Sequence, residues 1–141
     1  MSFEFVEDVT SDLAFVARGP TPDAVFRAAG EALLAATLEE PEALREEVRR
    51  DLALAEPDLE LLLLHYLNEL VYLRDAESLL LRADRLDVAA GADARLAAEL
   101  VGERIDRTRH RLLAEVKAAT AHGLHVGRAD DGWEARVTLD V

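Results

Sequence analysis

Asp12 and Asp140 place carboxylates at polar positions of segments that otherwise alternate like β-strands. The clearest alternation fills residues 133–141, where one face is apolar: Trp133, Ala135, Val137, Leu139 and Val141. A period of two predicts a half-buried strand, so Asp140 should face away from the core while Val141 faces it. The terminal carboxylate would then lie beside the Asp140 side chain. Chain ends usually fray unless a sheet holds them, so two acidic groups on an ordered end are unusual.

Carboxylate oxygens gathered in this way suit a hard divalent cation such as Ca²⁺, Mg²⁺ or Mn²⁺. Asp12, Asp140 and the terminal carboxylate of Val141 are therefore the candidate ligands of such a metal site. Asp8 is close in sequence and is a second-rank candidate, either as a further ligand or as a group that supports one. The alternative is that these residues are ordinary solvated acids, which are common on protein surfaces.

His122 is a second-rank candidate of a different kind. It falls on the apolar face of a predicted strand, between Thr120 and Leu124. A lone histidine in that position is most often a hydrogen-bonded core residue. Gly123 beside it indicates a bulge or a close backbone approach, which strands use to aim side chains at sites. The sequence leaves open whether His122 belongs to the core or supports the acidic site.

Three polar residues of a predicted helix, His65, Asn68 and Glu69, form no recognisable catalytic motif. Their spacing differs from the pair of histidines four residues apart that binds zinc in metalloproteases. We interpret them as residues that pack and cap the helix against a sheet.

The charge of the chain argues against direct binding of nucleic acid. Its 141 residues include 29 acidic and 16 basic side chains, for a net charge of −13. Nucleic-acid binding takes most of its affinity from cations that neutralise phosphates. We therefore expect the chain to act through a protein partner with a basic surface, since complementary charge speeds encounter.

The rest of the composition predicts a soluble, cytoplasmic protein with one domain over residues 1–141. Half of the residues are apolar, which favours a packed core, and the absence of cysteine excludes disulfides and thiolate metal sites. No apolar run reaches the roughly 20 residues that span a bilayer, and no signal peptide opens the chain. The sequence also contains no glycine-rich phosphate loop and no nucleophile elbow, so we do not expect a self-sufficient enzyme.

The candidate residues must be positioned by helices and strands. The sequence patterns predict an α+β fold with seven mostly antiparallel strands and two main helices. Helical spacing of apolar residues predicts one helix over 22–38, with Gly30 packed closely on a sheet, and a second that Pro57 and Asp58 open. Alternation predicts two strands within 3–17, one over 44–55, two between 79 and 105, one over 112–126, and the last strand. A type I′ turn at Asp131–Gly132 should join the last two.

Three blocks of the sequence together resemble the archease family, and they span the whole chain. The first runs from Phe3-Glu4-Phe5 to Val9-Thr10-Ser11-Asp12 and on to Gly19, and it resembles the opening strand pair with its His-Thr-Ala-Asp motif. The second, Leu-His-Tyr-Leu-Asn-Glu-Leu-Val-Tyr-Leu at 64–73, is similar to the Trp-Leu-Asn-Glu-Leu-Leu-Tyr helix. The third, residues 117–124 and 132–141, resembles the closing hairpin. Val9 and Ser11 depart from the motif, whereas Thr10 and Asp12 match it.

Archeases are the protein cofactors of RtcB-type RNA ligases, so the resemblance implies a function. It implies a non-catalytic accessory protein that promotes guanylylation of the ligase and its multiple turnover, in tRNA splicing or RNA repair. It also implies a core of the SHS2 type with inserted strands. The aspartates that match Asp12 and Asp140 would bind a metal and be needed for activity. No role passes from the motif's histidine to Val9.

Two other functions are compatible with the same residues. The first is a small metal-dependent hydrolase or phosphotransferase, although the chain lacks a phosphate cradle and its negative charge would repel phosphorylated substrates. The second is a chaperone-like modulator of another RNA-modifying enzyme, such as a tRNA methyltransferase.

Overall fold

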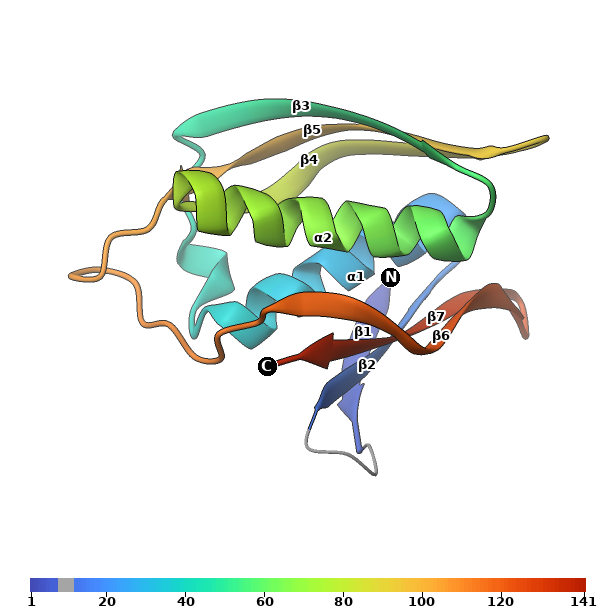
Figure 1. The fold of residues 1–141 in the computed structure, drawn as a ribbon, viewed down its shortest axis with the longest axis horizontal. Coiled ribbons are helices and arrows are strands. Elements are labelled where there is room, and N and C mark those ends of the chain that lie inside the picture. Colours follow the sequence, from blue (N-terminus) through green and yellow to red (C-terminus); the bar gives the residue numbers. More distant parts are fainter. Residues whose placement is uncertain (8–11) are drawn as a thin grey trace.

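Two antiparallel sheets enclose a middle layer of two helices (Figure 1). The computed structural model describes residues 1–7 and 12–141. Helices α1 (Pro22–Thr37) and α2 (Leu59–Glu77) each contact strands of both sheets. This arrangement confirms the predicted α+β class with seven strands and two main helices, and it places the core between the sheets.

The first sheet contains both segments that carry the candidate aspartates. Its strand order is β1 (Ser2–Val6), β2 (Leu13–Gly19), β7 (Gly132–Asp140) and β6 (Ala118–Ala129). The alternation predicted for the last strand is confirmed, since Ala135, Val137 and Leu139 are fully buried. Val141 is an exception. It lies beyond β7 and is 42% exposed, so the prediction that it faces the core is wrong.

The second sheet covers the other side of the helices, in the order β3 (Val48–Glu56), β5 (Ala94–Arg104) and β4 (Leu79–Ala90). The strand predicted over 44–55 starts later, at Val48. A short 3₁₀ helix, η1 (Pro41–Ala43), comes before it, and Leu44 is buried in a small separate cluster with Leu34, Leu38 and Leu80. Leu44 therefore shares the apolar period of β3 without belonging to the strand.

Both helices begin at side-chain caps that the sequence makes recognisable. The Oγ1 of Thr21 accepts the N–H of Ala24 at 3.2 Å, and the Oδ1 of Asp58 accepts the N–H of Leu61 at 2.8 Å. These bonds satisfy backbone donors that the first turn leaves free. The second predicted helix is confirmed, and one stripe of it is buried, made of Leu62, Leu63, Tyr66, Leu67, Leu70 and Val71. Leu61 is 41% exposed and lies outside this stripe.

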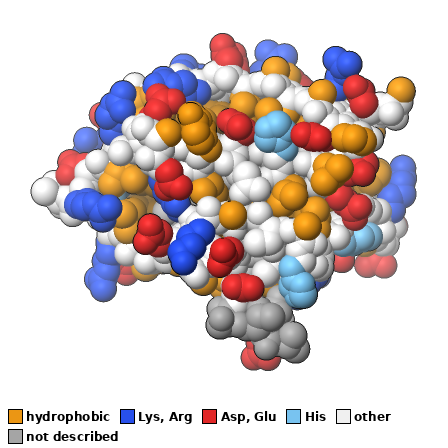
Figure 2. All heavy atoms as spheres, viewed as in Figure 1, with side chains coloured by type: hydrophobic (Ala, Val, Ile, Leu, Met, Phe, Trp, Pro, Cys, Tyr) orange, Lys and Arg blue, Asp and Glu red, His pale blue; other side chains and the backbone are white. Residues whose placement is uncertain are grey.

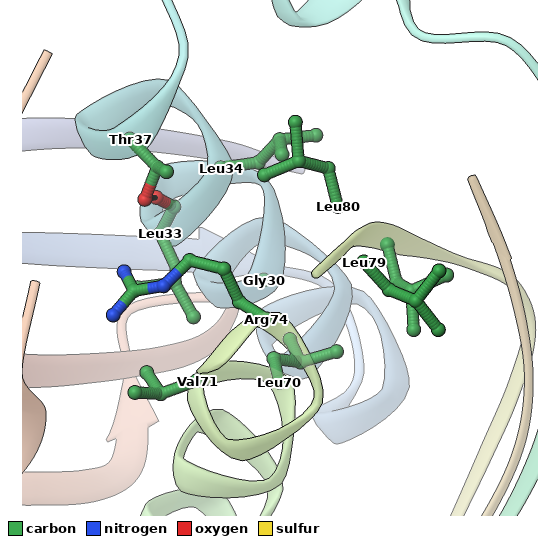
Figure 3. Close-up of a pocket in the computed structure, with 10 residues that line it drawn as sticks. Gly30, Leu33, Leu34, Thr37, Leu70, Val71, Arg74, Leu79 and Leu80 are labelled. Carbon is green, nitrogen blue, oxygen red and sulfur yellow. Dashed lines mark hydrogen bonds between the residues drawn. The ribbon is translucent and has the colours of Figure 1, made fainter. Parts of the chain in front are cut away.

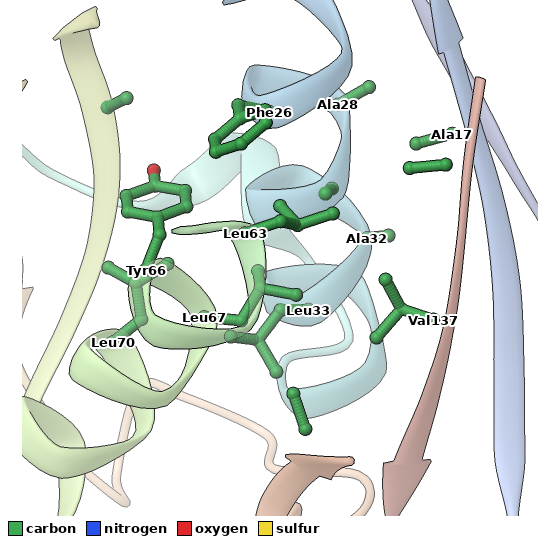
Figure 4. Close-up of a cluster of buried hydrophobic side chains, with 14 of the residues drawn as sticks. Ala17, Phe26, Ala28, Ala32, Leu33, Leu63, Tyr66, Leu67, Leu70 and Val137 are labelled. Atoms are coloured by element: carbon green, nitrogen blue, oxygen red, sulfur yellow. The ribbon is translucent and has the colours of Figure 1, made fainter. Parts of the chain in front are cut away.

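Gly30 allows the two helices to approach closely, rather than a helix and a sheet as predicted. A Cβ at position 30 would lie 3.2 Å from the Oη of Tyr66, and the ring of Tyr66 stacks on Phe26 with centroids 6.3 Å apart. Figure 4 shows these rings together with leucines from both helices. Figure 3 shows the remaining space between α1, α2 and β4, a cavity of about 20 Å³, which is room for a single water.

The strand predicted over 112–126 begins only at Ala118. Residues 112–117 instead run across the end of α1, where the N–H groups of Leu113 and Ala114 donate to the carbonyls of Thr37 and Ala36 at 2.8 and 3.2 Å. The last turn of a helix leaves its carbonyls without helical partners. The alternating apolar residues of this segment therefore pack in two different places. Leu112 packs against the small cluster, and Val116 is fully buried in the main core.

A buried ionic cluster anchors the connection between β5 and β6. Glu103 is only 3% exposed, and its Oε2 accepts the N–H of Arg45 at 2.6 Å and lies 3.3 Å from His110 Nε2. Its other oxygen pairs with Arg109. His110 Nδ1 accepts the N–H of Asp106 at 2.9 Å, so this nitrogen carries no proton and the ring is neutral.

The neutral state of His110 predicts a pH dependence of stability. Burial lowers the pKa of His110, and Arg109 lowers it further, while Asp106 opposes the shift. The native state therefore binds a proton more weakly than the unfolded chain, whose histidine pKa is about 6.5. The stability due to this residue is complete above that pH and is lost as the pH falls below it.

Urea unfolding from about pH 8 to about pH 5 tests this, because the unfolded-state pKa of about 6.5 lies within the range. The free-energy difference between the wild type and His110→Asn, which keeps a short acceptor and cannot be protonated, should shrink as the pH falls. A difference that stays constant would contradict the assignment.

Tyr66 provides a second stability test. Its Oη is buried without a hydrogen-bond partner among the described residues, and burial raises the pKa of this hydroxyl. Removing an unsatisfied buried hydroxyl removes its desolvation cost, so Tyr66→Phe should raise the free energy of unfolding by about 1 kcal/mol. Leu67→Ala, which opens a cavity beside it, should instead lower this energy by about 2 to 5 kcal/mol. A loss of stability in Tyr66→Phe would show that the hydroxyl has a partner.

Candidate metal site at the end of the first sheet

The pairing of β2 with β7 brings the two candidate aspartates together. Leu13 lies opposite Leu139, and the next residues in the same register are Asp12 and Asp140. Side chains alternate along strands, so Asp140, the last residue of β7, belongs to the face opposite to that of buried Leu139, and Asp12 is the bend residue just before β2. Asp140 is exposed and Asp12 is partly buried. The two ends of the sequence therefore meet at one end of the first sheet.

A basic residue lies just before the neighbouring strand β6, at this end of the sheet. Ala118 of β6 lies opposite Asp140, and the N–H of Lys117 donates to the Asp140 carbonyl at 2.7 Å. Lys117 is exposed and is the only lysine in the chain. We did not select it from the sequence, although its rarity among 16 basic residues and its place at the start of the third block were signals.

Two threonines lie next along the same face. Thr138 is fully buried, and its Oγ1 has no hydrogen-bond partner among the described residues. Its carbonyl accepts the hydroxyl of Thr120, from β6, at 3.1 Å. Because Thr138 precedes Asp140 by two residues, both belong to the same face of the sheet. The unsatisfied hydroxyl adds a neutral oxygen near the carboxylates, which is the donor chemistry that hard cations prefer.

A wide bulge in β6 interrupts the sheet beside these residues. Between the pairs Thr120–Thr138 and His125–Arg136, four residues of β6 stand opposite one residue of β7. Gly123, within the bulge, has a φ of +65°, a conformation that other residues adopt only with strain. Bulges are frequent next to functional sites, where they redirect side chains.

The bulge corrects the prediction for His122. This residue is exposed, and its N–H lies 3.4 Å from the Thr120 hydroxyl. The extra residues break the period of two that placed His122 on the apolar face, so it is not a core histidine. A supporting role near the carboxylates stays a prediction.

Among the described residues, Asp12 and Asp140 would supply only part of a cation site. Like charges directly opposite on neighbouring strands destabilise a sheet, and a bound divalent cation would offset this between Asp12 and Asp140. Within residues 1–7 and 12–141, no group of three or more histidine, aspartate or glutamate side chains is arranged to hold a metal. Asp8 and Val9 lie outside the described residues. The oxygen donors that the structure brings together fit a hard cation, and the complete ligand set stays a prediction.

A second polar cluster lies on the outer side of α2. His65 Nδ1 is 2.9 Å from Glu56 Oε1, and its Nε2 is 3.7 Å from Glu69 Oε1. Figure 2 shows this side of the molecule, where acidic and histidine side chains lie among apolar ones and most basic side chains lie near the outline. All three side chains are partly exposed, so these pairs contribute little stability.

Asn68 contacts the sheet in the way the sequence predicted. Its side chain forms two hydrogen bonds with the backbone of Ala119 in β6. The predicted packing of this part of the helix against a sheet is therefore confirmed.

No helix in the described part of the chain is both long and apolar enough to cross a membrane.

Comparison with known proteins identifies the family. Residues 3–141 match the model of the Archease protein family (MTH1598/TM1083). The chain belongs to the archease family, as its three blocks indicated.

Curated relatives match over nearly their whole length. The protein archease of Methanosarcina barkeri is 31% identical over 136 residues, which cover 95% of this chain and 92% of the relative. The protein archease of Archaeoglobus fulgidus is 28% identical over 141 residues and covers both chains completely.

Solved structures show the same fold. Protein 1598 of Methanobacterium thermoautotrophicum superposes with a TM-score of 0.83 at 28% identity, and covers 99% of this chain and 98% of its own. A Thermotoga maritima protein described as an archease and possible chaperone superposes with a TM-score of 0.66 at 17% identity. That match covers 96% of this chain and 95% of its own, and it supports the fold alone.

The left-handed conformation of Gly123 gives a test of the bulge. Gly123→Ala places a Cβ on a residue with positive φ, so it should lower the free energy of unfolding by about 1 to 2 kcal/mol. Gly91→Ala is the matched control, because a Cβ there would meet no atom within 4 Å and its φ is not positive. Equal stabilities of the two variants would show that the bulge adopts another conformation in solution.

Proposed function

We propose that this protein is a non-catalytic cofactor of an RtcB-type RNA ligase, and that it acts in the cytoplasm in tRNA splicing or RNA repair. It would promote guanylylation of the ligase and allow repeated turnover. Membership of the archease family supports this proposal, as does the position of Asp12 and Asp140 at the end of the first sheet. The convergence of these two aspartates is the observation that carries it.

The charge of the protein favours a protein partner over RNA itself. With a net charge of −13, the whole molecule repels phosphate backbones and attracts a basic, RNA-binding surface. The exposed Asp140 would approach such a surface from the edge of the molecule. This geometry suits contact with the mouth of a cationic cleft.

We propose further that Asp12, Asp140 and the terminal carboxylate of Val141 hold a divalent cation, Ca²⁺, Mg²⁺ or Mn²⁺. When bound, the cation would offset the repulsion between the carboxylates and present positive charge at the sheet end. Asp8 and His122 are second-rank contributors. The pairing of β2 with β7 and the buried hydroxyl of Thr138 support a site of hard oxygen donors here.

Multiple-turnover RNA ligation tests the role of Asp140. Asp140→Ala should reduce stimulation of the ligase at least about tenfold, the size of effect expected when a metal site is disrupted. Asp131→Ala, an exposed aspartate in the hairpin between β6 and β7, should stimulate normally. Calorimetric titration with Ca²⁺ and Mn²⁺ should show binding to the control and little to Asp140→Ala.

Unchanged stimulation by Asp140→Ala would contradict the role of this carboxylate. Phosphoesterase activity of the protein alone with Mn²⁺ would instead favour a hydrolase. Recovery of an RNA methyltransferase and no ligase in a pull-down would favour a modulator of a different enzyme.

A further inference from the structure

We propose that Asn68 is a positioning residue for the Asp12–Asp140 pair, acting from α2 through strand β6. The inference rests on the proposed metal site. It adds a residue that is distant from both aspartates in the sequence and does not belong to the strands that carry them. Its basis is a pair of hydrogen bonds at the edge of the first sheet.

Asn68 bonds to β6 as a neighbouring strand would. The N–H of Ala119 donates to the Asn68 Oδ1 at 2.8 Å, and the Asn68 Nδ2 donates to the Ala119 carbonyl at 3.1 Å. β6 is an edge strand whose other neighbour is β7. In an antiparallel sheet, a residue directs both its N–H and its C=O to the same side. Ala119 therefore turns both groups away from β7, and one carboxamide satisfies them.

The residue that Asn68 holds is adjacent to the candidate site. Ala119 lies opposite Leu139, and Ala118 lies opposite Asp140. Asp140 is thus held between the start of β2, just after Asp12, and the short part of β6 that Asn68 secures. This part of β6 ends at the bulge after Thr120, so the regular pairing beyond the bulge cannot hold it in register.

Two other side chains of α2 bond to the same edge at different places. The Oε2 of Glu60 accepts the N–H of Val126 at 3.1 Å, on the far side of the bulge. Arg74 donates to the carbonyl of Val116, before the strand begins. Among the described residues, Asn68 is the one side chain of α2 that forms a hydrogen bond to the segment of β6 that pairs with Leu139 and Asp140.

The helix makes a firm support for this bond. Tyr66, Leu67 and Leu70, next to Asn68 in α2, are buried between the two sheets. Without the carboxamide, the N–H and C=O of Ala119 would lose both partners on the α2 side. The strand could then shift beside a bulge that already contains Gly123. Removing a residue that orients metal ligands typically lowers the affinity for the metal by about 10- to 100-fold.

Ca²⁺ titration calorimetry and amide hydrogen exchange on the intact protein test the inference, with Asn68→Ala compared with Glu60→Ala. Glu60→Ala is the matched control, because it removes an α2–β6 bond beyond the bulge. Asn68→Ala should speed exchange of the Ala119 amide and weaken Ca²⁺ binding at least about tenfold. Glu60→Ala should speed exchange at Val126 and leave Ca²⁺ affinity within about twofold of the wild type, below the effect of an orienting residue. Thermal unfolding of both variants identifies any general loss of structure.

The outcomes separate the two proposals. If the wild type binds Ca²⁺ and Asn68→Ala binds it equally well, Asn68 has no positioning role, while the metal site stands. An equal loss of affinity in both variants would show a general effect of loosening β6, and would also overturn the inference. If the wild type binds none of Ca²⁺, Mg²⁺ and Mn²⁺, the metal site fails and the positioning role fails with it.

Discussion

The pairing of β2 with β7 is the constraint on which the rest of the account depends. The fully buried residues Phe15, Ala17, Val137 and Leu139 fix the register, since a slip of one residue would turn the apolar side chains of a strand out of the core. The same register brings Asp12 and Asp140 to one end of the sheet. The register that buries the apolar side chains is therefore also the register that places the charged groups. The buried pairs therefore keep the ends of β2 and β7 that carry these aspartates next to each other.

The middle helical layer supports this sheet end on one side, and the other side stays accessible. α2 packs between the sheets through its leucines and Tyr66, and it satisfies the edge of β6 with polar side chains. An unpaired sheet edge is a site for unwanted association, so the helix also protects this edge. At the same time, Asp140 stays exposed. An acidic, solvent-facing end on a firmly packed sheet suits a protein that acts by contact with a partner.

Much of the fold could be predicted from the sequence because the apolar patterns were local and strong. The stripe of α2, the caps at Thr21 and Asp58, and the alternation in β7 each follow from neighbouring residues. The errors arose where an apolar residue serves a different surface from its neighbours. Leu44 and Leu112 extend the period of a strand but pack in a separate cluster. The hairpin was also placed one residue too late: Gly132 is already in β7, and Asp130, with a φ of +51°, makes the turn.

The candidate site was only partly predictable. The pairing of Asp12 with Asp140 requires long-range strand order, which the family resemblance implied and local patterns could not supply. The bulge that exposes His122 leaves only Gly123 as a trace in the sequence. Strand pairing places Lys117 and Thr138 close to Asp140 in the sheet, and neither residue type points to a metal site by itself.

Titration of Mn²⁺ followed by nuclear magnetic resonance tests the central claim most directly, because this paramagnetic ion broadens the signals of nearby amides. If the two ends of the sequence converge on one cation, the amides of Leu13, Ala118 and Asp140 should broaden at the lowest Mn²⁺ concentrations. Those of Ala53 and Ala97 in the second sheet should be unaffected at the same concentrations. Selective broadening at a different part of the molecule, or uniform weak broadening over the whole chain, would contradict the claim.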